Sequence, residues 1–295
     1  MSATPENVPT RLAAFAAVIG LAFGAAALAG AAIDPTDRED VVAGAGHDGV
    51  EEAHGSGGGG RAALSGLAVS RDGYTLEPDR THFAREGRKR FTFRIVDAHG
   101  RVVRDEYELE ADRELHLVVV RHDTATYEHV HPRKGEDGTW SVDLALSEPG
   151  VYRAYADFQT DGKKRVLGTD LFVPGDFTPR PLPQPESVTE IDGYSIEVAA
   201  SQPLEAGQVR TLTFSIRRGE SPVEALQPYL GSRGHLVALR EGDLGYLHVH
   251  PDESVGDNAV EFGATFPTAG RYRLFFQFKT GGDVRTVAYT IEVPR

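Results

Sequence analysis

The sequence predicts an all-β protein, with two tandem immunoglobulin-like antiparallel β-sandwiches after one N-terminal transmembrane helix. Three observations lead to this fold class. A stretch of 22 residues near the start carries no charge, and such a length covers a bilayer core at about 1.5 Å per residue. The rest of the chain repeats itself with a period near 120 residues. Within each repeat, short alternating runs are separated by turn residues, and none indicates an amphipathic helix.

The N-terminal segment sets the predicted compartment. We expect residues 1–11 in the cytoplasm and residues 12–33 as a single-pass anchor in the cell membrane. Arg11 precedes the uncharged stretch and four acidic residues follow it, which favours an extracytoplasmic location for the bulk of the chain. The alternative is a signal peptide cut near Ala27-Leu28-Ala29, which would make the protein secreted.

A Gly-rich segment and a Pro-rich segment separate the predicted domains. Residues 34–65 contain a run with eight Gly between positions 43 and 60, which predicts a flexible tether. Residues 174–186 hold five Pro, which favours an extended, semi-rigid linker. The first sandwich repeat is therefore predicted at 66–173 and the second at 187–295.

The end of each repeat has the pattern of a β-hairpin. Asp161-Gly162 and Gly281-Gly282 are turn signals in equivalent positions. Trp140 has no aromatic counterpart in the second repeat and is predicted to be a core residue of the first. The strands expected around the two turns cover residues 151–160 and 164–173, and residues 271–280 and 284–293.

The composition excludes several classes of function. The 31 basic residues against 44 acidic ones give a net charge of −13, which argues against nucleic acid as a partner. There is no Cys, and the one Met is the first residue. Disulfides, thiolate catalysis, iron–sulfur clusters and sulfur-built sites for Cu⁺ are therefore excluded. Any bound metal must be held by His and carboxylates.

One segment of the duplication has diverged less than its surroundings. Residues 116–132 and 235–251 are identical at nine of 17 positions at a fixed offset of 119. Both read as β-hairpins turning near Asp123-Thr124 and Gly242-Asp243. Each segment contains a His at its start and a His-x-His near its end.

The hairpin register brings these histidines onto one face. Two strands folded about the midpoint pair residues whose numbers sum to 247 in the first repeat, so His116 faces His131. His129 lies two residues from His131 and shares its face. In the second repeat the sum is 485, and the same pairing places the three equivalent histidines on one face. The two predicted trios are His116, His129 and His131, and His235, His248 and His250.

Three neutral imidazoles on one sheet face are a suitable ligand set for Cu²⁺ or Zn²⁺. Tyr127 and Tyr246 share that face and could complete or support the coordination. Two alternatives stay open. The histidines could be structural, at the end of a packed core, or the face could be where the two repeats pack against each other, because these strands are apolar on both sides.

Other chemistry is sparse, and we do not predict an enzyme. The sequence has no phosphate-binding Gly-rich loop and no Gly-x-Ser-x-Gly motif. Glu106, Glu108 and Glu110 alternate with Tyr107 and Leu109, and we expect them to form the solvated face of one strand. His82, His99 and His122 have no counterparts and are expected at the surface.

Several motifs resemble those of a bacterial family of membrane-anchored tandem β-sandwich proteins. They are His-Leu-Val-x-x-Arg, Tyr-x-His-Val-His-Pro and Gly-x-Tyr-Arg, together with the anchor and the Pro-rich linker. That family is mostly described as uncharacterised secreted or membrane proteins, so the resemblance implies architecture more than function. The final strands of each repeat are distantly similar to YtkA-like and CopC-type copper-associated periplasmic domains, which implies a preference for copper.

The predicted function is a membrane-tethered extracytoplasmic metal-binding protein with one three-His site per repeat. It would act as a buffer, chaperone or sensor of Cu²⁺ or Zn²⁺, and its partner would be another envelope protein or a metal transporter. The first alternative is a non-catalytic cell-envelope interaction module with structural histidines. The second alternative is a hydrolase in which a three-His metal activates water.

Overall fold

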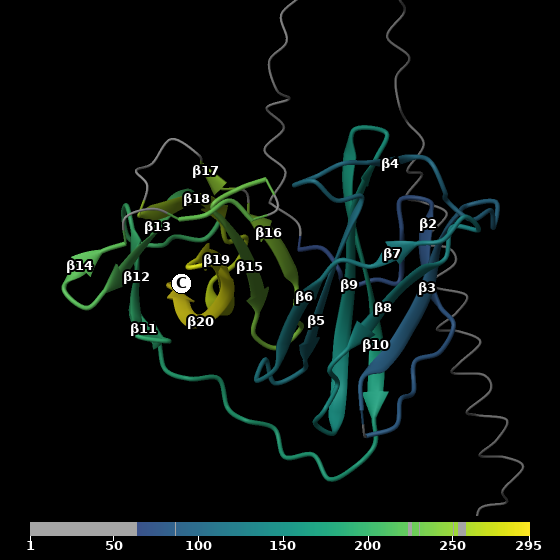
Figure 1. Ribbon diagram of the computed structural model, residues 1–295, viewed down its shortest axis with the longest axis horizontal. Coiled ribbons are helices and arrows are strands. Elements are labelled where there is room, and N and C mark those ends of the chain that lie inside the picture. The colour runs from purple at the N-terminus through teal and green to yellow at the C-terminus, as the bar shows by residue number, and fades with distance from the viewer. Residues whose placement is uncertain (1–63, 86, 224–225, 230, 250, 253–257) are drawn as a thin grey trace, which may run out of the picture. The chain divides into compact units, whose positions relative to one another are not determined.

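The described part of the chain is all-β. The computed structural model describes residues 64–85, 87–223, 226–229, 231–249, 251–252 and 258–295, which form strands and turns without an α-helix (Figure 1). Within these residues there is no helix long and apolar enough to cross a membrane. The predicted anchor at 12–33 and most of the predicted tether lie outside them.

The first repeat is built from two antiparallel sheets. One has the strand order β1-β2-β3-β8-β7, and the other has the order β10-β9-β5-β6, with β4 also paired to β9. Apolar side chains of both sheets meet in one buried core. The strands are β1 (Ser70–Arg71), β2 (Tyr74–Pro78), β3 (Lys89–Asp97), β4 (Tyr107–Glu108), β5 (Leu115–Arg121), β6 (Tyr127–Val130), β7 (Arg133–Lys134), β8 (Trp140–Leu144), β9 (Gly150–Thr160) and β10 (Lys163–Val173).

The second repeat has the same arrangement with its own core. One sheet has the order β11-β12-β13-β18-β17, with β14 also on β13, and the other has the order β16-β15-β19-β20. The strands are β11 (Val188–Ile191), β12 (Tyr194–Ala200), β13 (Val209–Arg218), β14 (Ser221–Pro222), β15 (Gly234–Arg240), β16 (Tyr246–Val249), β17 (Pro251–Asp252), β18 (Ala259–Thr265), β19 (Gly270–Thr280) and β20 (Asp283–Val293).

Both predicted terminal hairpins are confirmed. The strands β9 and β10 pair from Thr160↔Lys163, so the loop is the two residues Asp161-Gly162. Both have positive φ, 52° and 65°, as the favoured two-residue hairpin turn requires. In the second repeat, Gly281 and Gly282 have positive φ in the same place.

Trp140 is a core residue, as predicted. It is 2% exposed, and its Nε1–H donates to the Tyr107 hydroxyl at 3.1 Å. The two rings meet edge to face with their centroids 5.2 Å apart. This pair satisfies the one polar atom that Trp140 brings into the core.

The outer faces of the two His-bearing sheets pack against each other. A third apolar cluster joins strands of both repeats and includes Val118, Val120 and Tyr155 from the first and Val237, Leu239 and Phe275 from the second. The contacts are reciprocal. Tyr127 stacks on Phe275 with centroids 4.0 Å apart, and the equivalent residues Tyr246 and Tyr155 lie 4.9 Å apart. Reciprocal contacts of this kind are the pattern of a two-fold interface between two copies of one domain.

The first described residues lie along this junction. Ser65 exchanges backbone hydrogen bonds with Tyr246 of the second repeat, at 3.1 and 3.0 Å. The next residue, Gly66, donates to the Val166 carbonyl of the first repeat at 3.2 Å. The segment can lie this close only because residue 168 is a glycine: a Cβ at that position would lie 2.0 Å from the Gly66 oxygen. The segment therefore binds both repeats at once.

We expect Phe275→Ala to destabilise the first repeat although it lies in the second. The substitution removes the ring stacked on Tyr127, and large-to-small changes at buried Phe cost about 3–5 kcal/mol. Trp140 is the only Trp and lies in the first repeat, so its fluorescence during urea unfolding reports that repeat alone. Its midpoint should fall. Leu109→Ala, at a side chain that is 72% exposed, is the control. An unchanged Trp140 transition in Phe275→Ala would mean that the interface contributes no stability.

Candidate metal site

The His-bearing hairpin of the first repeat has the predicted register. In β5 and β6, Val118 pairs with His129 and Val120 pairs with Tyr127, and the numbers of each pair sum to 247. Successive side chains of a strand alternate between the two faces, so the register decides which side of the sheet carries the histidines. They lie on the outer face, which packs against the second repeat, and not in the core of their own sandwich.

The second hairpin has the equivalent register. Val237 pairs with His248 and Leu236 with Val249, and the numbers sum to 485 as predicted. Of the second trio, His235 is described and is 9% exposed. The side chain of His248 and the whole of His250 lie outside the described residues. The second trio therefore stays a prediction from the sequence.

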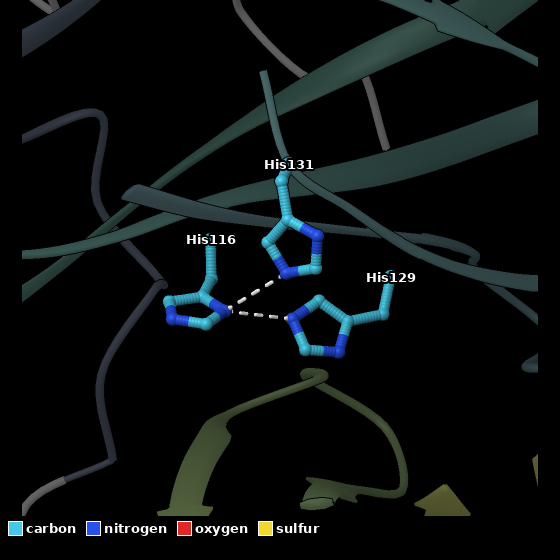
Figure 2. A group of neighbouring side chains, drawn as sticks. All are labelled: His116, His129 and His131. Carbon is cyan, nitrogen blue, oxygen red and sulfur yellow. Dashed lines mark hydrogen bonds between the residues drawn. The ribbon is translucent and has the colours of Figure 1, made fainter. Parts of the chain in front are cut away.

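The first trio is assembled in the structure. Figure 2 shows the three rings directed toward one another, with His116 from β5, His129 from β6 and His131 just after it. His116 Nδ1 lies 3.0 Å from His129 Nε2 and 3.3 Å from His131 Nε2. One potential ligand atom from each ring lies within 4.8 Å of the other two. Nitrogens bound tetrahedrally to one zinc ion at about 2.0–2.1 Å are themselves about 3.3–3.4 Å apart, so the two separations from His116 are close to those around one ion.

Neighbouring groups indicate which nitrogen of His116 and His129 carries the proton. His116 Nε2 lies 3.0 Å from the Glu110 carbonyl oxygen, which can only accept, so Nε2–H donates to it. His129 Nδ1 lies 2.7 Å from Gln277 Oε1 of the second repeat. In the assigned orientation of the Gln277 amide, its Nε2 donates to Thr286 Oγ1 at 3.0 Å and its Oε1 faces His129. His129 Nδ1–H is therefore the donor.

This assignment leaves two lone pairs pointed at each other. In neutral rings, His116 Nδ1 and His129 Nε2 are both acceptors, and they face each other at 3.0 Å. Two acceptors at this distance repel each other unless a cation, either a proton or a metal ion, lies between them. Ligating histidines whose other nitrogen donates to a carbonyl or a side chain are the usual arrangement at protein metal sites.

Burial makes the proton a poor occupant. The pKa of His129 lies well below its ordinary value, first because burial penalises the charged ring and then because His116 and His131 are close. Burial and the His116 and Arg113 charges lower the pKa of His131 to about 3. Neutral imidazoles at physiological pH are the form that binds metals.

His131 connects the trio to solvent. It lines a cavity of 330 Å³ together with Arg90, Arg133, Ser141, Val142 and Asp143. His116, by contrast, is 3% exposed. The cavity therefore gives an ion access to His131, and a route of entry is one requirement for a working metal site.

The two tyrosines take different places from the histidines. The Tyr127 ring stacks on Phe275, and its hydroxyl is buried without a hydrogen-bond partner in the described part of the chain. The Tyr246 hydroxyl donates to Asp157 Oδ2 at 3.1 Å. Both rings belong to the apolar junction between the repeats, and their suggested support of the metal stays a prediction.

Sequence reasoning missed the groups that orient the trio. Gln277 lies 148 positions from His129, and only the packing of the repeats brings the two together. One signal was present: Gln277 and Asp157 occupy equivalent positions and pair across the sheet with His235 and His116. The register thus places a polar residue beside the first His of each repeat.

The carboxylate run differs from the expectation of a solvated strand face. Only Tyr107 and Glu108 form a strand, and Leu109, rather than its acidic neighbours, is 72% exposed. Glu110 is held by Lys164 at 2.5 Å, while its carbonyl accepts from His116. Ala111 and Asp112 have positive φ, 47° and 61°, and form a turn that Glu110 and Arg113 close by exchanging backbone hydrogen bonds. His82, His99 and His122 are exposed, as predicted.

The sequence matches one family model twice. A domain of unknown function (DUF8832) covers residues 68–174 and 189–295, which agrees with a tandem repeat. No curated protein matches the chain significantly. The suggested similarity to YtkA-like and CopC-type domains is not supported by these comparisons.

Solved structures match the chain at low similarity. The Escherichia coli adhesin FdeC is 14% identical, with 77% of this chain and 66% of that one covered at a TM-score of 0.26. A Salmonella α2-macroglobulin variant is 15% identical, with coverages of 79% and 15% and a TM-score of 0.25. Yersinia pseudotuberculosis InvD is 10% identical, with coverages of 76% and 58% and a TM-score of 0.24. The chain spans less than two thirds of each.

The low pKa values of His129 and His131 predict a pH-dependent stability for the metal-free protein. Unfolded histidines take up protons near pH 6.5, whereas the folded ones do not. The stability is therefore fully present above pH 6.5 and falls as the pH drops below it. Urea unfolding of chelator-treated protein should show a lower unfolding free energy at pH 5.5 than at pH 7.5. His131→Asn should reduce this difference and His99→Asn should not. A difference equal in all three proteins would contradict the assignment.

Proposed function

We propose that this chain, which belongs to the family of the domain of unknown function DUF8832, binds a Cu²⁺ or Zn²⁺ ion through His116, His129 and His131. The observation that carries the proposal is the pair of facing acceptor nitrogens in His116 and His129, 3.0 Å apart. The other nitrogens of these two rings lie against Glu110 and Gln277, and a metal ion between the facing nitrogens would relieve the contact.

The residues present suit a borderline metal. Imidazole nitrogens are good ligands for Zn²⁺ and Cu²⁺, and the absence of Cys argues against a site built for Cu⁺. Exchange of the ion with solvent through the cavity at His131 is what a buffer, chaperone or sensor needs. The uncharged stretch at 12–33, with Arg11 before it and acidic residues after it, supports the extracytoplasmic, membrane-tethered location proposed for this role.

A second candidate function is a non-catalytic envelope interaction module in which the histidines are structural. It is favoured by one observation: His116 and His235 each donate to a backbone carbonyl six residues earlier, at 3.0 and 2.9 Å, next to the apolar junction of the repeats. Such bonds stabilise a packed interface without any metal. This candidate does not by itself account for the facing acceptors of His116 and His129.

Metal analysis of the untagged full chain separates the two candidates. After loading with Cu²⁺ or Zn²⁺ and removal of loosely held ions, we expect the wild type to retain at least one ion per chain. The double variant His129→Ala/His131→Ala should lose one ion per chain relative to the wild type. The matched control His99→Ala/His122→Ala removes two exposed histidines and should retain the wild-type content.

A third variant, His248→Ala/His250→Ala, tests the predicted site of the second repeat in the same assay. Far-UV circular dichroism establishes that each variant keeps its β structure. Equal, substoichiometric metal in the wild type and in His129→Ala/His131→Ala would end the metal proposal and leave the structural histidines as the better account.

Gln277→Leu should weaken metal binding without removing a ligand. The change deletes the acceptor that orients His129, and loss of such a partner typically costs about 10–100-fold in metal affinity. Gln277→Glu keeps an acceptor at the same place and should bind at least as tightly as the wild type. Competition with a chelator of known affinity measures both. Wild-type affinity in Gln277→Leu would show that His129 is held in place by other contacts.

A further inference from the structure

A fourth imidazole, from the second repeat, lies beside the trio. The ring centroid of His235 is 5.9 Å from that of His129 and 6.4 Å from that of His116. Within the trio the centroids are 5.0 to 5.2 Å apart. His235 is the counterpart of His116 in the duplication, and the reciprocal packing of the two sheets brings these equivalent residues toward each other.

His235 is prepared in the same way as His116. Its Nε2 lies 2.9 Å from the Tyr229 carbonyl oxygen, as that of His116 lies 3.0 Å from the Glu110 carbonyl oxygen. In both, the backbone acceptor is six residues earlier. The proton is therefore on Nε2, and Nδ1 is the nitrogen with the lone pair. In both repeats, therefore, a bond from Nε2–H to a backbone carbonyl leaves the lone pair of the buried imidazole on Nδ1.

His235 lies outside the group of three whose ligand atoms are within 4.8 Å of one another, but it is close enough to join the ion of the trio by a small movement. A metal–nitrogen bond is about 2.0–2.1 Å and a ring centroid lies about 1.2 Å beyond its nitrogen, so two imidazoles on opposite sides of one ion have centroids about 6.5 Å apart. That is the largest separation that one ion permits. The two His235 distances lie at or just below this limit, and a movement of the His235 ring by about 1 Å would bring them to the tetrahedral value of about 5.3 Å.

The two carboxylates beside the trio bind other groups. Asp157 is fully buried and accepts from the Tyr246 hydroxyl, and Glu110 is bound by Lys164. A three-imidazole site leaves at least one coordination position to be filled. Among the described side chains near the trio, His235 offers the ligand type that matches the other three.

We propose that His235 is the fourth protein ligand of the ion held by His116, His129 and His131, so that the metal centre is shared by the two repeats. This inference rests on the proposed function of the trio. The ion then joins β5 and β6 of one sandwich to β15 of the other, and the centre is complete only when the repeats are packed together.

Counting imidazoles on the bound ion tests the proposal. The full chain is loaded with Cu²⁺ for pulsed electron paramagnetic resonance, which detects the remote nitrogens of coordinated imidazoles, and with Zn²⁺ for X-ray absorption. We expect one ion per chain with four imidazoles in the wild type. His235→Asn should give three imidazoles and a loss of affinity at least as large as that of Gln277→Leu. His99→Asn is the control at an exposed position.

The outcomes separate this inference from the proposed function. Three imidazoles in both the wild type and His235→Asn would overturn the shared centre and leave the trio as the site. Two ions per chain would also overturn it, in favour of one site in each repeat. No retained ion would overturn both proposals. The wild-type count decides the question even if His235→Asn fails to fold.

Discussion

The register of the β5–β6 hairpin is the constraint on which the rest depends. A strand alternates its faces residue by residue, so a slip of one position would move His129 into the core of its own sandwich and Val130 onto the outer face. The observed register puts His116 and His129 on one side and leaves Leu117 and Val119 for the core. One pairing choice therefore supplies both the interior of the sandwich and the nitrogen cluster outside it.

The outer face has two requirements that oppose each other. Packing two sheets favours dry apolar contact, and this is provided by Val118, Val120 and their counterparts. Buried imidazoles need polar partners, because an unsatisfied ring nitrogen costs free energy. The backbone of Glu110 and the side chain of Gln277 meet this need from the edge of the sheet and from the other repeat. The polar cluster and the apolar cluster thus stabilise the same junction by different means.

Much of the fold followed from local patterns. Two-residue turns at Asp161-Gly162 and Gly281-Gly282 and the midpoint of each His hairpin determine strand pairing directly, so these elements were predictable. The trio followed because its members lie within one hairpin. The partners of the trio could not be predicted in this way, because Gln277 and His235 come close to it only through packing between the repeats. The predicted carboxylate strand was wrong beyond Glu108, where the chain turns at Ala111 and Asp112 with positive φ, because neither residue is a Gly that would have indicated a turn in the sequence.

The reciprocal junction has an evolutionary consequence. A single-repeat ancestor with this surface would pair with an identical copy, and every substitution would then appear on both sides of the axis. Joining the copies into one chain removes that restriction. Asp157 and Gln277 occupy equivalent positions, yet one is a carboxylate that accepts from a tyrosine and the other an amide that accepts from a histidine. Such a division of labour is open to a fused pair and closed to a dimer of identical chains.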